Sequence, residues 1–242
     1  MCNRYQLRTN MHSVCRELDV QPAFDFDLPD EVFPFSKAPV AVLNREGDRE
    51  LRPMTFGMGK GGGRSSGRGP ALNNTRIESR EKWPWKKSFE KYRCVVPMTS
   101  FREPSYWGET EGTEVSFSAT DDRLLLAAGI FSFRDGGGDD NAPAELSMSL
   151  IMRPALPFVM EHGHHRSPFF LRPGGVGAWL QRSARPPDES IEVLREYADD
   201  PPLVFQTDRQ MAASWTKRRA AKLQSRDDQL AEIEQTGPLG ID

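Results

Sequence analysis

The sequence lacks several features that define well-known classes of protein. Its 242 residues contain three cysteines, an odd number without the spacing of a disulfide framework or a zinc site: Cys2, Cys15 and Cys94. No apolar run approaches the ~18 residues that a membrane helix needs, and the first thirty residues lack the layout of a secretion signal. We therefore expect a cytoplasmic, monomeric protein with reduced thiols, no membrane association, and neither a metal ion nor another cofactor.

Net charge is also small, but it is unevenly distributed. A net charge of −3 and a pI near 5.9 argue weakly against a nucleic-acid-binding protein. Residues 51–100, however, carry eleven Lys and Arg against three Glu, so this segment is +8 and the remainder −11. Such a separation indicates a basic face for phosphates on an acidic body, although a solvated charged surface is the commoner cause of a charge run.

Short β-type runs bounded by turn-forming residues predict much of the chain as strand. They cover residues 39–44, 51–57, 93–97, 113–119, 124–133 and 146–152. Helical patterns are fewer and cover 77–91, 190–198 and the stretch from Asp208 to about Glu234. The sequence therefore predicts an α+β fold, in which a largely antiparallel, barrel-like sheet core is flanked by helices within a single domain.

The chain opens MCNRY, with a cysteine directly after the first methionine. Removal of Met1 would leave Cys2 with a free α-amine and a free thiol on adjacent carbons, a 1,2-aminothiol. Chain termini are commonly disordered and tolerant of many residues, which is the alternative explanation.

Two other segments contain groups suited to chemistry. In LNNTRIES (72–79), Asn74 could cap a helix, and the guanidinium of Arg76 is suited to a phosphate. In SFREPSYWG (100–108), aromatic neighbours of Glu103 can raise its carboxyl pKa toward neutrality, as a general acid or base needs. A surface glutamate at the end of a strand is the alternative.

Three of the four histidines lie in HGHHRSPFF (162–170). Three histidines in four residues suggest zinc, but a zinc site normally draws a further ligand at a defined spacing, and none is evident. We favour an imidazole that titrates near neutral pH.

Together and in this order, MCNRY, NTRIES, SFREP and HHRSPFFL resemble the motifs of the SOS response-associated peptidase (SRAP) family, the abasic-site processing proteins. The family pattern runs MCGR[YF], NARxE, GFYEW and HDRMPVIL. The resemblance covers about residues 2–207, the expected SRAP-like domain, and leaves 208–242 as a helical extension and tail. Substitutions around the matched groups mark the chain as divergent: Ser100, Arg102, Pro104, His165 and Ser167.

The resemblance implies both a site and a reaction. The matched catalytic residues are Cys2, Asn74, Glu103 and His164. Arg4 and Arg76 would hold the flanking phosphates of the DNA, and the basic segment, with Lys86 and Lys87, would extend this DNA-binding track. Such proteins act on abasic sites in single-stranded DNA. The aminothiol would close on the aldehyde of the opened sugar to give a thiazolidine, a covalent DNA–protein crosslink of lyase-like character.

Two other functions stay open. The same residues suit autocatalytic release of Met1 by an N-terminal nucleophile, a peptidase or hydrolase activity. A non-covalent module for single-stranded DNA would need no reactive cysteine. We favour crosslinking, because simple binding does not require Cys2, Glu103 and His164 together. The expected partner is single-stranded DNA that contains abasic sites, with nucleoid association when bound.

Overall fold

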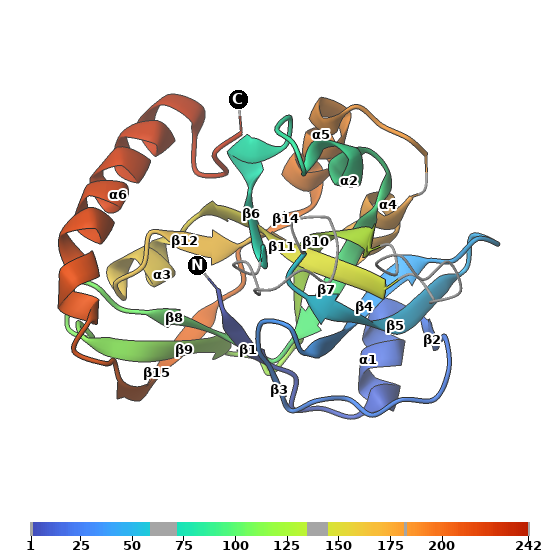
Figure 1. Ribbon diagram of the computed structural model, residues 1–242, viewed down its shortest axis with the longest axis horizontal. Helices are drawn as coiled ribbons and strands as arrows, with labels where there is room; N and C mark the ends of the chain where they lie inside the picture. Colours follow the sequence, from blue (N-terminus) through green and yellow to red (C-terminus); the bar gives the residue numbers. More distant parts are fainter. Residues whose placement is uncertain (1, 59–71, 135–144, 182, 242) are drawn as a thin grey trace.

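The computed structural model describes residues 2–58, 72–134, 145–181 and 183–241 (Figure 1). Its larger sheet contains, in chain order, β2 (Gln21–Pro22), β4 (Lys37–Leu43), β5 (Arg49–Phe56), β6 (Asn74–Arg76), β7 (Arg93–Met98), β10 (Leu125–Arg134), β11 (Glu145–Pro154), β12 (Arg166–Pro168), β13 (Phe170–Leu171) and β14 (Ala198–Asp199). Its strand order is β12-β11-β5-β4-β7-β10-β13-β14, with β2 on β5 and β6 on β11. Because β10 also pairs with β11, the strands from β11 round to β10 close into a barrel.

A second, smaller sheet packs beside the barrel. It contains β1 (Arg4–Gln6), β3 (Glu31–Val32), β8 (Ser100–Pro104), β9 (Thr113–Ala119) and β15 (Leu203–Gln210). The strand order is β15-β9-β8-β1-β3, and all its pairings are antiparallel. The first strand of the chain therefore lies inside a sheet, with a partner on each side.

Helices flank the sheets. They are α1 (Met11–Leu18), α2 (Lys86–Lys91), α3 (Pro157–Glu161), α4 (Val176–Leu180), α5 (Pro187–Tyr197) and α6 (Trp215–Thr236), with 3-10 turns η1 (Ile77–Ser79) and η2 (Pro173–Gly175). Of the described helices, none has both the length and the apolar character needed to cross a membrane. The α+β fold with a barrel-like sheet core is confirmed.

Both faces of the barrel strands are buried. Along β4, Val40 and Val42 belong to the core shared with the smaller sheet, while Ala41 belongs to a second core beneath the helices. Along β7, Cys94 and Val96 belong to the first core and Val95 belongs to the second. Successive side chains of a strand point to opposite faces, so one strand contributes to two apolar cores.

The structure differs from the sequence prediction mainly at helices. The stretch 77–91 divides into η1 and α2. The helix expected from Asp208 begins at Trp215, because residues up to Gln210 pair with β9. Helix α1 was not anticipated, although Asn10 caps it by accepting a hydrogen bond from the Ser13 amide at 2.8 Å.

Candidate active site

The N-terminal segment enters the interior of the protein. Tyr5 of β1 is paired with Val32 on one side and Phe101 on the other, which places Cys2 beside the end of β8. The Cys2 side chain is 0% exposed. Burial raises the pKa of the Cys2 thiol above its ordinary range, and the nearby Glu103 carboxylate raises it further. The thiol is therefore protonated at neutral pH and needs a base before it can act as a nucleophile.

Two asparagine side chains hold the backbone of Cys2. The Nδ2 groups of Asn73 and Asn74 donate to the Cys2 carbonyl oxygen at 3.1 and 2.8 Å. Asn74 lies in β6 opposite Leu150 of β11, so the barrel fixes its position, and its side chain caps no helix. Its Oδ1 is buried and accepts no hydrogen bond within the described ranges. This oxygen can therefore accept from an amine.

A carboxyl group and an imidazole meet beside Cys2. Oε2 of Glu103 lies 3.5 Å from Nε2 of His164, and neither side chain is exposed. Burial raises the pKa of Glu103 to about 7 and holds that of His164 well below its ordinary value. At neutral pH the imidazole is uncharged, while the carboxyl group is divided between its protonated and ionised forms.

A glycine turn directs His164 into this position. Gly163 has φ +95°, and a Cβ there would lie 2.0 Å from Oγ of Ser105 and 2.7 Å from the Trp107 carbonyl oxygen. The Gly163 carbonyl accepts from the Tyr106 amide at 2.9 Å, which ties the turn to the end of β8. The absence of a side chain thus allows the histidine turn to pack directly against the segment that carries Glu103.

The three clustered histidines have different surroundings. His162 packs its ring 4.0 Å from that of Phe205 and 4.4 Å from that of Phe158, as an aromatic core residue. The His165 ring lies 4.9 Å from that of His164, and burial lowers its pKa to about 3. No group of three His, Cys, Asp or Glu side chains within the described ranges is arranged to hold a metal ion.

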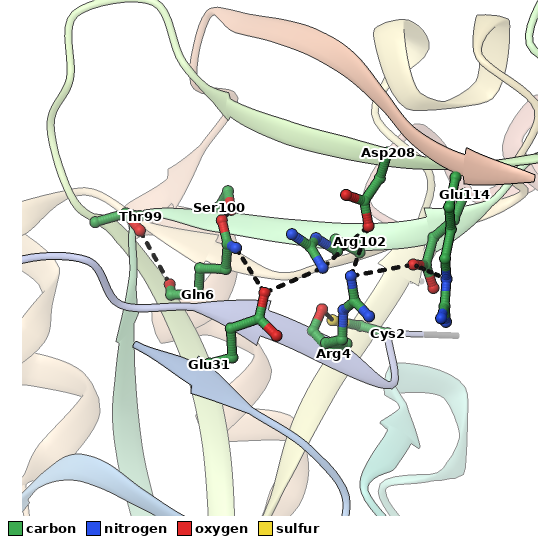
Figure 2. A network of polar contacts seen from close by, with 10 residues as sticks. Cys2, Arg4, Gln6, Glu31, Thr99, Ser100, Arg102, Glu114 and Asp208 are labelled. Atoms are coloured by element: carbon green, nitrogen blue, oxygen red, sulfur yellow. Dashed lines mark hydrogen bonds and ion pairs between the residues drawn. The ribbon is translucent and has the colours of Figure 1, made fainter. Parts of the chain in front are cut away.

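Arg4 belongs to a network of ion pairs in the smaller sheet (Figure 2). Its Nη2 lies 2.5 Å from Asp208 and 3.4 Å from Glu114. Arg102, opposite Arg4 on β8, pairs with Asp208 at 3.0 Å and with Glu31 at 3.2 Å. Because Arg4 already has two carboxylate partners, it could hold a phosphate only if these ion pairs opened.

The other predicted DNA-binding residues lie in two places. Arg76 ends β6, is exposed, and acts electrostatically on His165, which places it near the site. Lys86 and Lys87 lie on α2, which packs against α5, β7 and β10, and Lys86 pairs with Glu81 at 2.9 Å. The structure thus brings Cys2, Asn74, Glu103 and His164 together and leaves the two lysines on another part of the surface.

One residue near the site was missed by sequence reasoning. Lys222 of α6 is half-buried, its Nζ lies 5.7 Å from the centre of the Tyr106 ring, and its charge acts on Glu103. No sequence signal marks it, because one lysine in a polar helix is indistinguishable from its neighbours until the helix is docked.

The sequence matches the SOS response associated peptidase (SRAP) family over residues 1–213. The chain belongs to this family. The predicted resemblance is therefore confirmed, and the match ends just before α6. No curated protein shows a significant match to the chain.

Several solved structures have a fold similar to that of this SRAP-family chain. A protein from Bordetella bronchiseptica has a TM-score of 0.69 at 18% identity, covering 86% of this chain and 100% of its own. A phage-related protein from the same organism has a TM-score of 0.64 at 19% identity, covering 86% and 95%. A protein from Bacteroides thetaiotaomicron has a TM-score of 0.67 at 16% identity, covering 89% and 94%.

Proposed function

We propose that this protein captures abasic sites in single-stranded DNA as a covalent thiazolidine formed by Cys2 after removal of Met1. The observation that carries the proposal is the shared burial of Cys2, Glu103 and His164, each at most 1% exposed, with the Cys2 backbone held by two asparagines. Membership of the SRAP family supports it, and so does the resemblance of the segments that carry these groups to the family's motifs.

The reaction joins one aminothiol to one aldehyde with loss of one water. The α-amine of Cys2 adds to the aldehyde carbon of the ring-opened sugar, and dehydration of the carbinolamine gives an imine. The thiol sulfur then bonds to the imine carbon, while its proton leaves and the nitrogen gains one. Both nucleophiles are carried by one residue, so ring closure benefits from a high effective molarity.

The buried pair supplies the proton transfers. Glu103, with a pKa of about 7, can accept the thiol proton in its ionised form and donate to the departing water in its protonated form. His164 is neutral, so it can take a proton from the sugar hydroxyl as the ring opens to the aldehyde. The Oδ1 of Asn74, which accepts no hydrogen bond from the described residues, can accept from the α-amine and orient it.

The test uses a single-stranded oligonucleotide with one abasic site and a denaturing gel. We expect the parent protein and Cys15→Ser to give a band that survives boiling in detergent, and Cys2→Ser to give none. Cys15 is a fair control because it is a half-buried thiol on α1, in another part of the structure. A stable band with Cys2→Ser would overturn the proposal. Cyanoborohydride should restore a band with that variant by reducing its imine.

Autocatalytic release of Met1 is a second candidate. It is favoured by the proximity of the Cys2 thiol to the Glu103 carboxyl group and by the peptidase activity for which the SRAP family is named. Cell-free synthesis without methionine aminopeptidase, followed by mass spectrometry of the intact protein, tests it. We expect the parent to lose Met1 and Glu103→Gln to retain it. Retention by both proteins would exclude self-processing.

Non-covalent binding of single-stranded DNA is the third candidate. It predicts equal affinity for intact and abasic strands, a strong salt dependence and no covalent product. The same gel, with binding curves for both strands, separates it from crosslinking.

A further inference from the structure

The helix that follows the matched family region lies against the site. α6 begins at Trp215 and, in Figure 1, runs along the side of the molecule that carries α3, β12 and the ends of β8 and β9. Arg219 pairs with Glu111 at 2.8 Å, and the Arg226 guanidinium lies 5.3 Å from the centre of the Trp107 ring. Charged side chains of α6 therefore contact the loop that follows Glu103.

Lys222 lies between these two contacts along the helix. Its Nζ is 5.7 Å from the centre of the Tyr106 ring, which is itself 6.4 Å from the ring of His164. Burial lowers the pKa of Lys222, the Glu103 charge partly opposes this, and the charges of Arg76 and Arg218 lower the pKa further. Arg76, Arg218 and Lys222 therefore act on the same region. Among the residues that the structure describes, no carboxylate forms an ion pair with any of these three cations.

A buried polar atom lies on the same side of the site. His165 is 3% exposed, its ring packs on His164, and its Nδ1 has no hydrogen-bond partner in the described part of the chain. Buried polar atoms in folded proteins are normally paired. An unpaired polar atom beside three cations that form no ion pair with the described residues favours an anionic, hydrogen-bonding ligand here.

We propose that α6 completes the site with a phosphate-binding cluster, which holds a phosphodiester of the DNA strand next to the abasic sugar. The cluster consists of basic and imidazole side chains from β6, α6 and the turn before β12: Arg76, His165, Arg218 and Lys222. The cations supply the charge, and the neutral ring supplies a hydrogen bond. That the ligand is a DNA strand rests on the proposed function. Arg218 and Lys222 lie outside the matched family region.

The test measures binding of the full chain to a single-stranded oligonucleotide with tetrahydrofuran at the abasic position, by fluorescence anisotropy. This analogue has no aldehyde, so binding is read without covalent chemistry. Lys222→Met removes the charge and keeps an apolar stem, and Lys217→Met is the control at an exposed position of α6. We expect Lys222→Met to raise the dissociation constant about tenfold and to reduce the slope of log affinity against log salt by about 0.7. Lys217→Met should change affinity less than about twofold.

A second strand carries neutral methylphosphonate linkages on both sides of the tetrahydrofuran. The parent should bind this strand more weakly, and Lys222→Met should weaken that binding no further, because the contacted charge is gone. Lys222→Arg should keep most of the affinity for the phosphodiester strand. Equal binding by the parent and Lys222→Met, or the same loss on the methylphosphonate strand, would overturn the proposal. Tighter binding by Lys222→Met would also overturn it, and would show that α6 obstructs the strand.

Failure of the crosslinking chemistry gives a different pattern. If an aldehyde-containing strand yields no covalent product while the tetrahydrofuran strand still shows the Lys222 effect, the phosphate cluster stands and the role of Cys2 is wrong. If crosslinking proceeds and Lys222→Met binds and reacts like the parent, the cluster is wrong and the role of Cys2 stands.

Discussion

Nε2 of His164 faces Oε2 of Glu103 at 3.5 Å, in a region where neither side chain is exposed. The other ring nitrogen, Nδ1, lies 2.8 Å from the Arg166 carbonyl oxygen, an acceptor, which indicates that the ring proton resides on Nδ1. Nε2 then presents a lone pair to Glu103. A protonated Glu103 can donate to this lone pair, whereas an ionised Glu103 cannot. The carboxyl group and the imidazole can therefore share one proton.

The stability of the protein should depend on pH through Glu103. Burial raises its pKa from 4.5 to about 7, so the folded protein binds this proton more tightly than the unfolded chain does. The folded state therefore loses stability as pH rises from about 4.5 to about 7, by up to about 3 kcal/mol. Urea unfolding of the parent and Glu103→Gln at pH 5 and pH 8 measures this. The variant should lose less stability over the interval, and parallel behaviour of the two proteins would contradict the assignment.

The same variant should be slow in chemistry. Glu103→Gln keeps the shape of the side chain but cannot exchange a proton with the Cys2 thiol, so the crosslinking rate should fall about 10²- to 10⁴-fold. Glu109→Gln is the control, because Glu109 is 74% exposed on the loop that follows β8. Time courses on denaturing gels measure both rates. Similar rates for the two variants would remove Glu103 from the mechanism.

The two asparagines that hold Cys2 should differ in importance. Asn74→Ala removes the 2.8 Å bond to the Cys2 carbonyl and also the Oδ1 proposed to orient the amine, so crosslinking should fall at least about tenfold. Asn73→Ala removes a 3.1 Å bond to the same carbonyl and should have the smaller effect on rate. Each should cost about 1 kcal/mol of unfolding free energy. Equal rates for the two variants would show that the Asn74 Oδ1 has no role.

The turn before His164 should not tolerate a side chain. Gly163→Ala places a Cβ 2.0 Å from Oγ of Ser105 at φ +95°, so the turn must shift and carry His164 away from Glu103. Gly47→Ala is a close control, because its φ is +94° and nothing lies within 4 Å of the added carbon. We expect about 1 kcal/mol of destabilisation for Gly47→Ala and at least about 2 kcal/mol more for Gly163→Ala, with loss of crosslinking. Thermal unfolding and the gel assay test this, and matched melting temperatures would contradict it.

Several elements were predictable because their signal is local. The runs at 113–119 and 146–152 lie within β9 and β11, since alternating or continuously apolar runs reflect burial of one or both faces of a strand. The candidate reactive groups were also predictable, because the short motifs that carry them resemble those of the SRAP family in content and order. A barrel-like core was expected, but the strand pairings that close it were not, because no local pattern specifies that β11 pairs with β10 and with β5.

The sequence by itself determined which side chains can carry chemistry and that a strand-rich α+β core surrounds them, because residue type and apolar periodicity are properties of short segments. Tertiary structure alone decided their neighbours. It paired Arg4 with Asp208, turned His164 rather than His162 toward Glu103, and brought Lys222 of α6 to the Tyr106 ring. These outcomes depend on contacts between distant segments, and on the burial that shifts each pKa, and neither is encoded in a local pattern.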